Sequence, residues 1–313
     1  MFIKFWGVRG SVPTPLTPRQ LEGKVAAVIQ RIKPDDILSE EARGLFMAEL
    51  PASLLNSIGG NSTCVEIRLS DGTRIVLDGG TGLREMGIDM MKKKEIGLHL
   101  HIFFTHFHWD HIQGLPFFDP AYLPENSITY YSPMAKMETY LRDQMKAPYF
   151  PVTMDDMNAK KTFTTLHGST LDLGRGKISW RAMKHPGGCF AYKIEDRGKS
   201  LVFSSDTELR DKDFEKNPEN RRFFEGVDYL IMDSQYTLDE AIEKYEWGHS
   251  SYSLAVDFAA AWGVKNLGLF HHEPKYGDNK IYSILNSANW YANHLESRPL
   301  KIFLVTEGLE LEL

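Results

Sequence analysis

Short apolar runs that indicate β-strands occur in two blocks along the chain. The first block lies at 2–8, 64–69, 74–80, 99–104 and 127–132, and the second at 177–185, 189–196, 200–206, 227–233, 266–272 and 301–313. Periodic apolar positions predict helices near 83–94, 134–145, 251–263 and 280–295. Strand blocks with helices between and outside them are typical of an α/β domain in which two sheets lie between helices. We therefore expect a single domain over 1–313.

Residues 14–57 interrupt the first block with a helical pattern. Its apolar stripe consists of Leu21, Val25, Val28, Ile29 and Ile32. A second helix is expected to begin after Ser39 and to end at Pro51. We interpret this segment as a helical insertion that serves in packing or in a homodimer contact, with an active-site lid as the third alternative.

Composition and charge favour a globular protein. The 313 residues carry a net charge of −6 and are 42% hydrophobic, and no apolar run is long enough to span a bilayer. The first residues lack the pattern of a secretory signal, and the only two cysteines, Cys64 and Cys189, are far apart. We therefore expect a cytoplasmic protein without a membrane partner, whose thiols are buried and free, with pairing as the alternative. An acidic chain without a basic stripe also argues against a nucleic-acid partner without excluding it.

Polar residues recur where these apolar strands end. They are Asp78, His106, His185, Asp206, Asp233 and His271. Ligands of layered α/β folds collect at the carboxyl ends of strands. A single histidine there would be unremarkable, whereas six such residues indicate a common site.

The highest concentration of such residues is in the segment HFHWDH, which contains His106, His108, Asp110 and His111. Imidazole and carboxylate groups are natural ligands of Zn²⁺, Mn²⁺ and Fe. Because His106 and His108 alternate, both side chains can point at one ion. Asp110 and His111 follow a bend in the backbone, so they can face a second ion. We expect two divalent ions, with zinc first and manganese or iron as alternatives. The competing interpretation is a cluster that merely caps a helix.

The segment THFHWDH resembles the HxHxDH signature of the metallo-β-lactamase superfamily. LDGGTGL, KHPGG, SSDT and LFHHEP follow in the order of the family's other anchors. The resemblance implies an αββα four-layer sandwich, with the 14–57 insertion added near the N-terminus. It also implies one ion on His106, His108 and His185, a second on Asp110, His111 and His271, a bridging Asp206, and Asp78 orienting a ligand. His271 is preferred over His272 because L-x-L-x-H matches the family's last strand.

A second resemblance narrows the branch. WGHSSYSLAVDFAAAWGVKNLGLFHHEP is similar to a segment of tRNA 3′-processing ribonuclease Z and related phosphodiesterases. It implies that His249 contacts the scissile phosphate and protonates the leaving oxygen. The alternative is that His249 merely lies next to the residue that caps a helix. Ribonuclease Z pairs this histidine with a glutamate, but this chain offers the shorter Asp233. Asp110, His249 and Asp233 are thus the predicted catalytic residues.

The substrate prediction rests on a departure from ribonuclease Z. That family commonly has a long arm between the residues that correspond to His185 and Asp206, and here only a hairpin with a turn at 197–199 fits. WGVRGSVPTP, GGNSTC and HWDHIQGLPFF look like motifs of small-molecule phosphodiesterases in this branch. We expect hydrolysis of a small phosphodiester such as a cyclic nucleotide or a ribosyl cyclic phosphate. The alternatives are a tRNA 3′-processing endoribonuclease, a lactone or thioester hydrolase, and a non-catalytic nucleotide-binding protein.

Several residues near the predicted site are candidates for substrate contacts. Tyr149 and Phe150, in a proline-broken loop, could stack on a base. The adjacent glycines Gly187 and Gly188 would let the backbone approach a phosphate closely. Asn61 and Arg9 flank glycine-rich turns and are weaker candidates for hydrogen bonds to the substrate.

Overall fold

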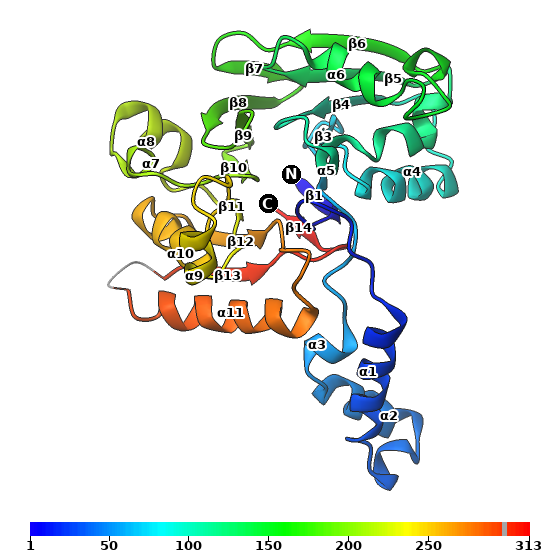
Figure 1. The fold of residues 1–313 in the computed structure, drawn as a ribbon, viewed down its shortest axis with the longest axis vertical. Coiled ribbons are helices and arrows are strands. Elements are labelled where there is room, and N and C mark those ends of the chain that lie inside the picture. The colour runs from blue at the N-terminus through cyan, green and yellow to red at the C-terminus, as the bar shows by residue number, and fades with distance from the viewer. Residues whose placement is uncertain (296–298) are drawn as a thin grey trace.

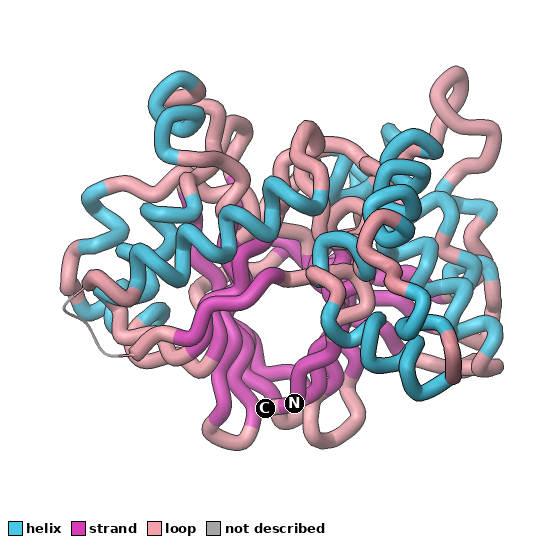
Figure 2. The backbone as a smooth tube through the Cα atoms, turned by 90° about the horizontal axis from the view of Figure 1, so that it is seen from below, coloured by secondary structure: helices cyan, strands magenta, loops and turns pink. Residues whose placement is uncertain are grey.

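The computed structural model, which describes residues 1–295 and 299–313, consists of two β-sheets packed face to face between helices. Figure 1 shows the two sheets with helices on their outer sides, and Figure 2 shows the strands in the middle of the molecule when it is seen from below. The predicted αββα sandwich is confirmed.

The first sheet is built mainly from the first strand block. Its seven strands are, in spatial order, β14 (Glu310–Glu312), β1 (Phe2–Gly7), β2 (Cys64–Arg68), β3 (Arg74–Leu77), β4 (His99–Phe103), β5 (Ser127–Ser132) and β6 (Lys160–Thr165). The β2–β3 pair, whose connecting turn contains Asp71 and Gly72, is antiparallel, and β3 to β6 run parallel.

The second sheet contains the second block. Its seven strands are, in spatial order, β13 (Lys301–Leu304), β12 (Asn266–Phe270), β11 (Tyr229–Asp233), β10 (Lys199–Ser204), β9 (Cys189–Asp196), β8 (Gly176–Met183) and β7 (Thr170–Leu173). Strands β10 to β13 are parallel, so their carboxyl ends lie at one edge of the sheet.

Aromatic and aliphatic side chains of both sheets fill the space between them. The ring of Phe270 lies 6.3 Å from that of Phe5 and 5.3 Å from that of Phe203, and Phe103 packs edge-on against Tyr192 at 5.5 Å. All five rings are fully buried. This core holds the two sets of strand ends in fixed positions relative to each other.

Helices cover the outer faces of the sheets. Helix α4 (Gly82–Lys92) packs on the first sheet, and α10 (Tyr252–Ala261) and α11 (Asp278–Ala292) pack on the second. The shorter helices are α5 (Trp109–Ile112), α6 (Met137–Gln144), α7 (Asp211–Phe214), α8 (Pro218–Phe224) and α9 (Leu238–Glu243), with 3₁₀ turns η2 (Leu115–Phe117), η3 (Asp119–Tyr122) and η4 (Met154–Asp156).

The structure corrects one predicted strand and adds two. The closing segment 301–313 is not one strand, because Gly308, with a φ of +82°, lies in a turn that sends β13 and β14 into different sheets. Strands β6 and β7 were missed. Both lie at sheet edges with half-exposed side chains, so neither contains the continuous apolar run of a central strand.

Residues 14–57, which we call the helical arm, project from the sandwich (Figure 1). They form α1 (Pro18–Ile29), η1 (Pro34–Ile37), α2 (Glu40–Glu49) and α3 (Ala52–Leu55). Thr17 and Gln20 form a capping box that begins α1, and Ser39 caps α2. Neither α1 nor α2 buries a residue, although the apolar stripe is present.

Two further observations bear on the sequence-based expectations. Cys64 and Cys189 are both buried and free. Among the described residues, none of the helices has the length and apolar character needed to cross a bilayer.

Candidate metal centre

The predicted strand-end residues converge at one end of the sandwich, where the carboxyl ends of strands from both sheets meet. Three of them, Asp78, Asp206 and His271, have positive φ angles of 60°, 48° and 60°. Left-handed backbone is uncommon for residues other than glycine and costs of order 1–3 kcal/mol per position. Strained backbone at three such positions indicates that the fold is shaped to aim these side chains.

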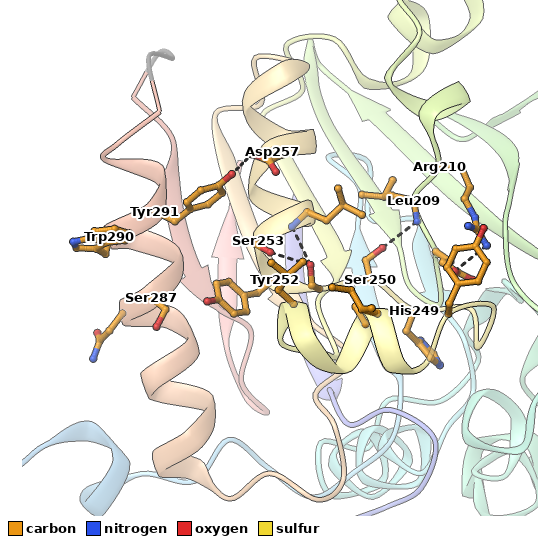
Figure 3. Close-up of a pocket in the computed structure, with 18 residues that line it drawn as sticks. Leu209, Arg210, His249, Ser250, Tyr252, Ser253, Asp257, Ser287, Trp290 and Tyr291 are labelled. Atoms are coloured by element: carbon orange, nitrogen blue, oxygen red, sulfur yellow. Dashed lines mark hydrogen bonds and ion pairs between the residues drawn. The ribbon is translucent and has the colours of Figure 1, made fainter.

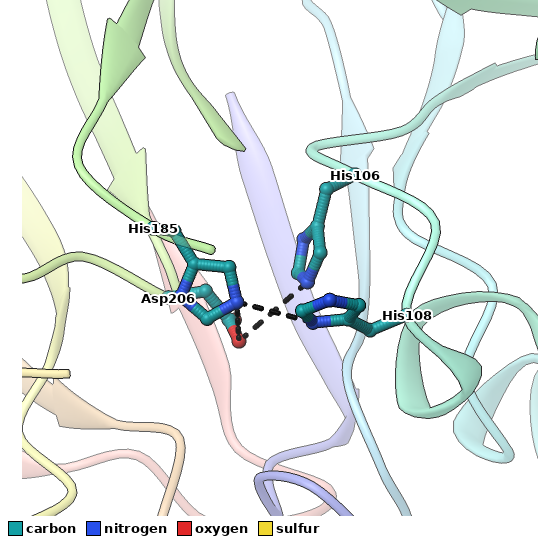
Figure 4. A group of neighbouring side chains, drawn as sticks. All are labelled: His106, His108, His185 and Asp206. Atoms are coloured by element: carbon teal, nitrogen blue, oxygen red, sulfur yellow. Dashed lines mark hydrogen bonds and ion pairs between the residues drawn. The ribbon is translucent and has the colours of Figure 1, made fainter. Parts of the chain in front are cut away.

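His106, His108, His185 and Asp206 form the first cluster (Figure 4). The Asp206 Oδ1 atom lies 3.7 Å from Nε2 of His106 and 3.8 Å from Nε2 of His185. His185 Nε2 in turn lies 3.1 Å from Nδ1 of His108. One carboxylate oxygen and three imidazoles therefore face a common point.

Asp110, His111 and His271 form the second cluster with the other oxygen of the same aspartate. The Asp206 Oδ2 atom lies 3.0 Å from His111 Nε2 and 3.2 Å from His271 Nε2. The Asp110 Oδ2 atom lies 3.2 Å from each of these two ring nitrogens. Asp206 thus presents one oxygen to each cluster, which is the arrangement of a carboxylate that bridges two cations.

The donor atoms fit divalent metal ions. Ligand atoms bound at about 2.0–2.1 Å around a tetrahedral zinc ion lie roughly 3.3 Å apart. His106 Nε2 and His111 Nε2 are buried and form no well-aligned hydrogen bond, although Asp206 oxygens lie 3.7 Å and 3.0 Å from them. A buried polar atom without a partner is costly, so a cation at these positions would satisfy both nitrogens.

The opposite ring nitrogens are fixed by hydrogen bonds. His111 Nδ1 donates to Asp78 at 2.8 Å, His185 Nδ1 to the Gly248 carbonyl at 2.9 Å, and His271 Nδ1 to Gln235 Oε1 at 2.9 Å. These contacts select the tautomer that leaves Nε2 free to bind a metal.

Asp78 has a second role in orienting the cluster. Its carboxylate accepts hydrogen bonds from the Thr105 amide at 2.8 Å and from Thr105 Oγ1 at 2.9 Å. Because that hydroxyl donates to Asp78, its oxygen can accept from His106 Nδ1, 3.0 Å away. Asp78 is therefore linked to an imidazole of each cluster.

The electrostatics of the centre favour a bound cation. Burial and the neighbouring His111 imidazole lower the pKa of His106 well below its usual range, so this ring stays neutral. Burial would raise the pKa of Asp206, but the neighbouring imidazoles, led by His111 and His271, hold it well below its usual range. Burial would lower the pKa of His111, but the carboxylates, led by Asp206, raise it well above its usual range. Ionised carboxylates buried in this way need positive charge, which divalent ions supply.

His249 and Asp233 lie beside the two clusters. His249 Nδ1 donates to Asp233 Oδ2 at 2.7 Å, so the shorter aspartate still reaches the ring. Burial opposes the charge on this imidazole, but Asp233 prevails and raises the pKa of His249 to about 9. The His249 ring stacks 5.1 Å from that of His271. The contact with Asp233 thus favours a protonated imidazole beside the two clusters.

A cavity of about 640 Å³ opens over the first cluster. His106, His108, Gly187, Gly188 and Tyr149 line it, which places three of the predicted substrate contacts at the site. A smaller cleft, lined by Asp110, Asp206 and His249 among others, opens over the second cluster.

Other predicted substrate contacts lie elsewhere. Phe150 packs at 5.4 Å against Phe117 and lines a different cavity from Tyr149. The Asn61 amide is engaged by Glu307. Arg9 is buried, with its guanidinium bonded to the carbonyls of Gly59 and Tyr276 at 2.8 Å and 3.0 Å, so it supports the fold.

Of the adjacent histidines 271 and 272, only His271 enters the cluster. His272 is buried and donates through Nε2 to the Val305 carbonyl at 2.8 Å.

Sequence reasoning missed Gln235, Thr105, Gly248 and Ser11. The Ser11 amide donates to Asp110 Oδ2 at 2.8 Å, and the other three contact ligand imidazoles. Gln235 lies two residues beyond Asp233, and Thr105 directly precedes the histidine cluster, so both could have been suspected. A backbone carbonyl or amide has no sequence signal.

Known proteins resemble this chain over most of its length. Ribonuclease Z of Sulfurisphaera tokodaii is 25% identical over 282 residues, which cover 76% of this chain and 90% of that protein. The metallo-β-lactamase fold protein YhfI from Bacillus subtilis has a similar structure, with a TM-score of 0.65, 15% identity, and coverage of 99% of this chain and 98% of that one. A diphosphatase from the PhnP family is also similar, with a TM-score of 0.63, 18% identity, and coverage of 100% and 97%.

The match to a family model settles the family. The model of the β-lactamase superfamily domain matches residues 73–272, more than half of the chain, and this span contains both clusters. The chain therefore belongs to the β-lactamase superfamily and is a metal-dependent hydrolase with the metallo-β-lactamase fold.

Proposed function

We propose that this protein is a phosphodiesterase that uses two divalent ions to hydrolyse a small phosphodiester. Cyclic nucleotides and ribosyl cyclic phosphates are the first candidates. The observation that carries the proposal is Asp206, whose two oxygens each face a separate cluster, beside a histidine with a raised pKa. Zinc is the first candidate metal, and manganese and iron suit the same donors.

Each group at the site has a separate role in the proposed reaction. When bound, the two ions would polarise the phosphoryl group and lower the pKa of a water molecule. Asp233 holds His249 through Nδ1, so Nε2 is the nitrogen available to the substrate. The carboxylate of Asp233 raises the pKa of His249 to about 9 in the metal-free chain, which favours the protonated imidazole that can donate to the leaving oxygen. The backbone of Gly187 and Gly188 lines the adjoining cavity.

Two observations support a small substrate over a large polyanion. The turn between β9 and β10 consists of little more than Arg197 and Gly198, so no long arm extends there. Tyr149 and Trp109 are 77% and 81% exposed at the cavity over the first cluster, where a base or sugar could pack against them.

The test is hydrolysis of bis-p-nitrophenyl phosphate by the zinc- or manganese-loaded protein. We expect turnover that a chelator abolishes and that Asp110→Ala removes, while Asp172→Ala, at an exposed strand position, behaves as the parent protein does. A panel of 2′,3′- and 3′,5′-cyclic nucleotides and ribosyl cyclic phosphates then defines the substrate. Turnover of lactones or thioesters without phosphodiesterase activity would replace the proposal.

A second candidate function is RNA 3′-end processing. It is favoured by the relative named ribonuclease Z, whose alignment covers 76% of this chain. Cleavage of a precursor tRNA at a defined position, faster than that of any small diester, would select this function. Absence of cleavage under conditions where bis-p-nitrophenyl phosphate is hydrolysed would exclude it.

A further inference from the structure

A groove of about 1130 Å³ lies between α9, α10 and α11 (Figure 3). Its walls carry several large apolar and aromatic side chains that the fold leaves open. Leu238, Ile242, Tyr245 and Trp290 are 56%, 68%, 62% and 63% exposed. Exposed apolar residues gathered around one hollow are a mark of a binding site rather than of ordinary surface.

The groove adjoins the metal centre at His249. This side chain lines both the groove and the cleft over Asp110 and Asp206. The loop 244–249, between α9 and α10, forms the wall of the groove on this side through Tyr245 and His249. An oxygen bound next to His249 therefore lies where the groove and the cleft meet.

Hydrogen bonds fix this wall to the metal ligands. The Glu208 carboxylate accepts from the Glu246 amide at 2.9 Å and from the Gly248 amide at 3.2 Å. The Gly248 carbonyl accepts from His185 Nδ1. Gly248 has a φ of +92°, and a Cβ there would lie 2.2 Å from the His185 ring, so only glycine fits. The groove and the metal centre are thus held in one fixed arrangement.

The lining offers no unpaired positive charge among the described residues. Arg210 lies 2.9 Å from Glu208 and 4.2 Å from the ring of Tyr245, so its charge is paired. Asp257 accepts from the Tyr291 hydroxyl at 2.8 Å and keeps a negative charge, which would repel a second phosphate or a carboxylate. The groove therefore suits an apolar group.

We propose that the metal centre also takes a second substrate class, linear phosphodiesters whose leaving alcohol carries an extended apolar arm, and that the groove binds this arm. The inference rests on the proposed function, because it places the leaving oxygen at His249. The other ester arm would occupy the cavity lined by His106 and Tyr149. A water oxygen bonds to phosphorus, the bond from phosphorus to the leaving oxygen breaks, and the leaving oxygen takes a proton from His249, which the proton released by the water replaces.

The test is the direction of cleavage of phenyl 4-octylphenyl phosphate. Its two phenols have nearly equal acidity, so the products report which arm lies in the groove. We expect 4-octylphenol and phenyl phosphate in roughly tenfold excess over phenol and 4-octylphenyl phosphate. The reason is that the groove buries the octyl chain only when the diester binds with its octylphenyl arm as the leaving group. Equal amounts, or an excess of phenol, would overturn the inference.

Two substitutions in the groove sharpen this test. Ile242→Asp and Trp290→Asp place a charge among the apolar side chains and should bring the product ratio near one. Ile29→Asp, at a 62% exposed position of the helical arm, is the matched control and should keep the excess. The ratio of two products does not depend on the total rate, so partial loss of activity does not obscure it. Retention of the excess in both groove variants, or its loss in the control, would also overturn the inference.

Bis-p-nitrophenyl phosphate separates the two proposals. If the parent protein hydrolyses this diester but shows no preferred direction with the octyl substrate, the groove inference fails and the proposed function stands. If it hydrolyses neither diester, the proposed function fails, and the inference that rests on it fails too.

Discussion

The metal centre and the helical arm contrast in how their side chains are held. Except for the exposed His108, the polar side chains of the two clusters are almost fully buried, and several are bonded on the side that faces away from the clusters. The arm exposes apolar residues such as Leu21, Val25 and Ile29, and its described anchor to the sandwich includes Lys24, which bonds to Asp278 and to the Ser53 carbonyl.

This contrast reverses the common pattern in which apolar side chains are buried and polar side chains are exposed. Polar residues are buried where they have partners, and a cation would complete the set. Apolar residues stay exposed where no second layer covers them. We therefore expect substitutions in the centre to change activity strongly, and substitutions in the arm to leave both activity and folding nearly unchanged.

The largest effect is expected for Asp206→Asn, because this residue faces both clusters. Each metal position loses a charged ligand, which corresponds to several kcal/mol of stabilisation or roughly 10³- to 10⁴-fold in rate. Elemental analysis of the purified variant should show a reduced metal content. A variant that kept its full metal complement and activity would contradict the bridging role.

The next effect concerns His249, which lies beside the metal ligands. His249→Gln should reduce the rate by about 10²-fold or more through loss of the proton donor. Metal content should not change, and Asp233→Asn should reproduce a smaller part of the loss. A change confined to metal affinity would instead make His249 a ligand.

A smaller loss is expected from the residues that orient the ligands. Gln235→Ala removes the acceptor for His271 Nδ1 and should weaken metal binding about 10- to 100-fold. Competition with a chromogenic chelator measures the affinity. An unchanged affinity would show that the hydrogen bond does not position the imidazole.

His272 provides a comparison of a structural histidine with the adjacent ligand. Burial is the main cause that lowers its pKa to about 3, so the folded state holds it neutral. The unfolded chain takes up a proton below about pH 6.5, so this contribution to stability is present above that pH and is lost as the pH falls. The loss amounts to about 2 kcal/mol at pH 5.

The measurement is urea unfolding of the metal-free protein at pH 7.5 and pH 5. His272→Gln keeps a donor for Val305 but does not titrate, so its stability should decrease less between the two pH values. Equal decreases in the parent and the variant would contradict the assigned pKa.

The smallest effect is expected in the helical arm. Val25→Asp, at a 50% exposed position, should change the free energy of unfolding by no more than about 0.5 kcal/mol. Sedimentation analysis of the same variant tests the predicted homodimer contact. A dimeric parent and a monomeric variant would assign the arm to the interface, whereas a large loss of stability in a monomer would show that the arm is part of the core.

Local sequence patterns could predict much of the fold and of the donor set. The HFHWDH cluster and the polar residues at strand ends could be recognised because apolar runs precede them and the motif is contiguous. The division of 301–313 between two sheets could not, because it depends on a turn at Gly308 that only the packed sandwich determines. The contacts of Gly248 and Ser11 could not either, since backbone groups carry no residue preference.

The predicted substrate contacts Tyr149 and Phe150 are a second example of what the sequence alone could not predict. Both are aromatic and adjacent, and the sequence offers no reason to separate them. The loop conformation places one over the metal centre and the other against Phe117.

The most direct test of the central claim is a metal titration of chelator-stripped protein, followed by elemental analysis and by hydrolysis of bis-p-nitrophenyl phosphate. We predict that two equivalents of a divalent ion bind per chain and that activity reaches its maximum only with the second. Binding of one ion or none, or hydrolysis that persists in the stripped protein, would contradict the account.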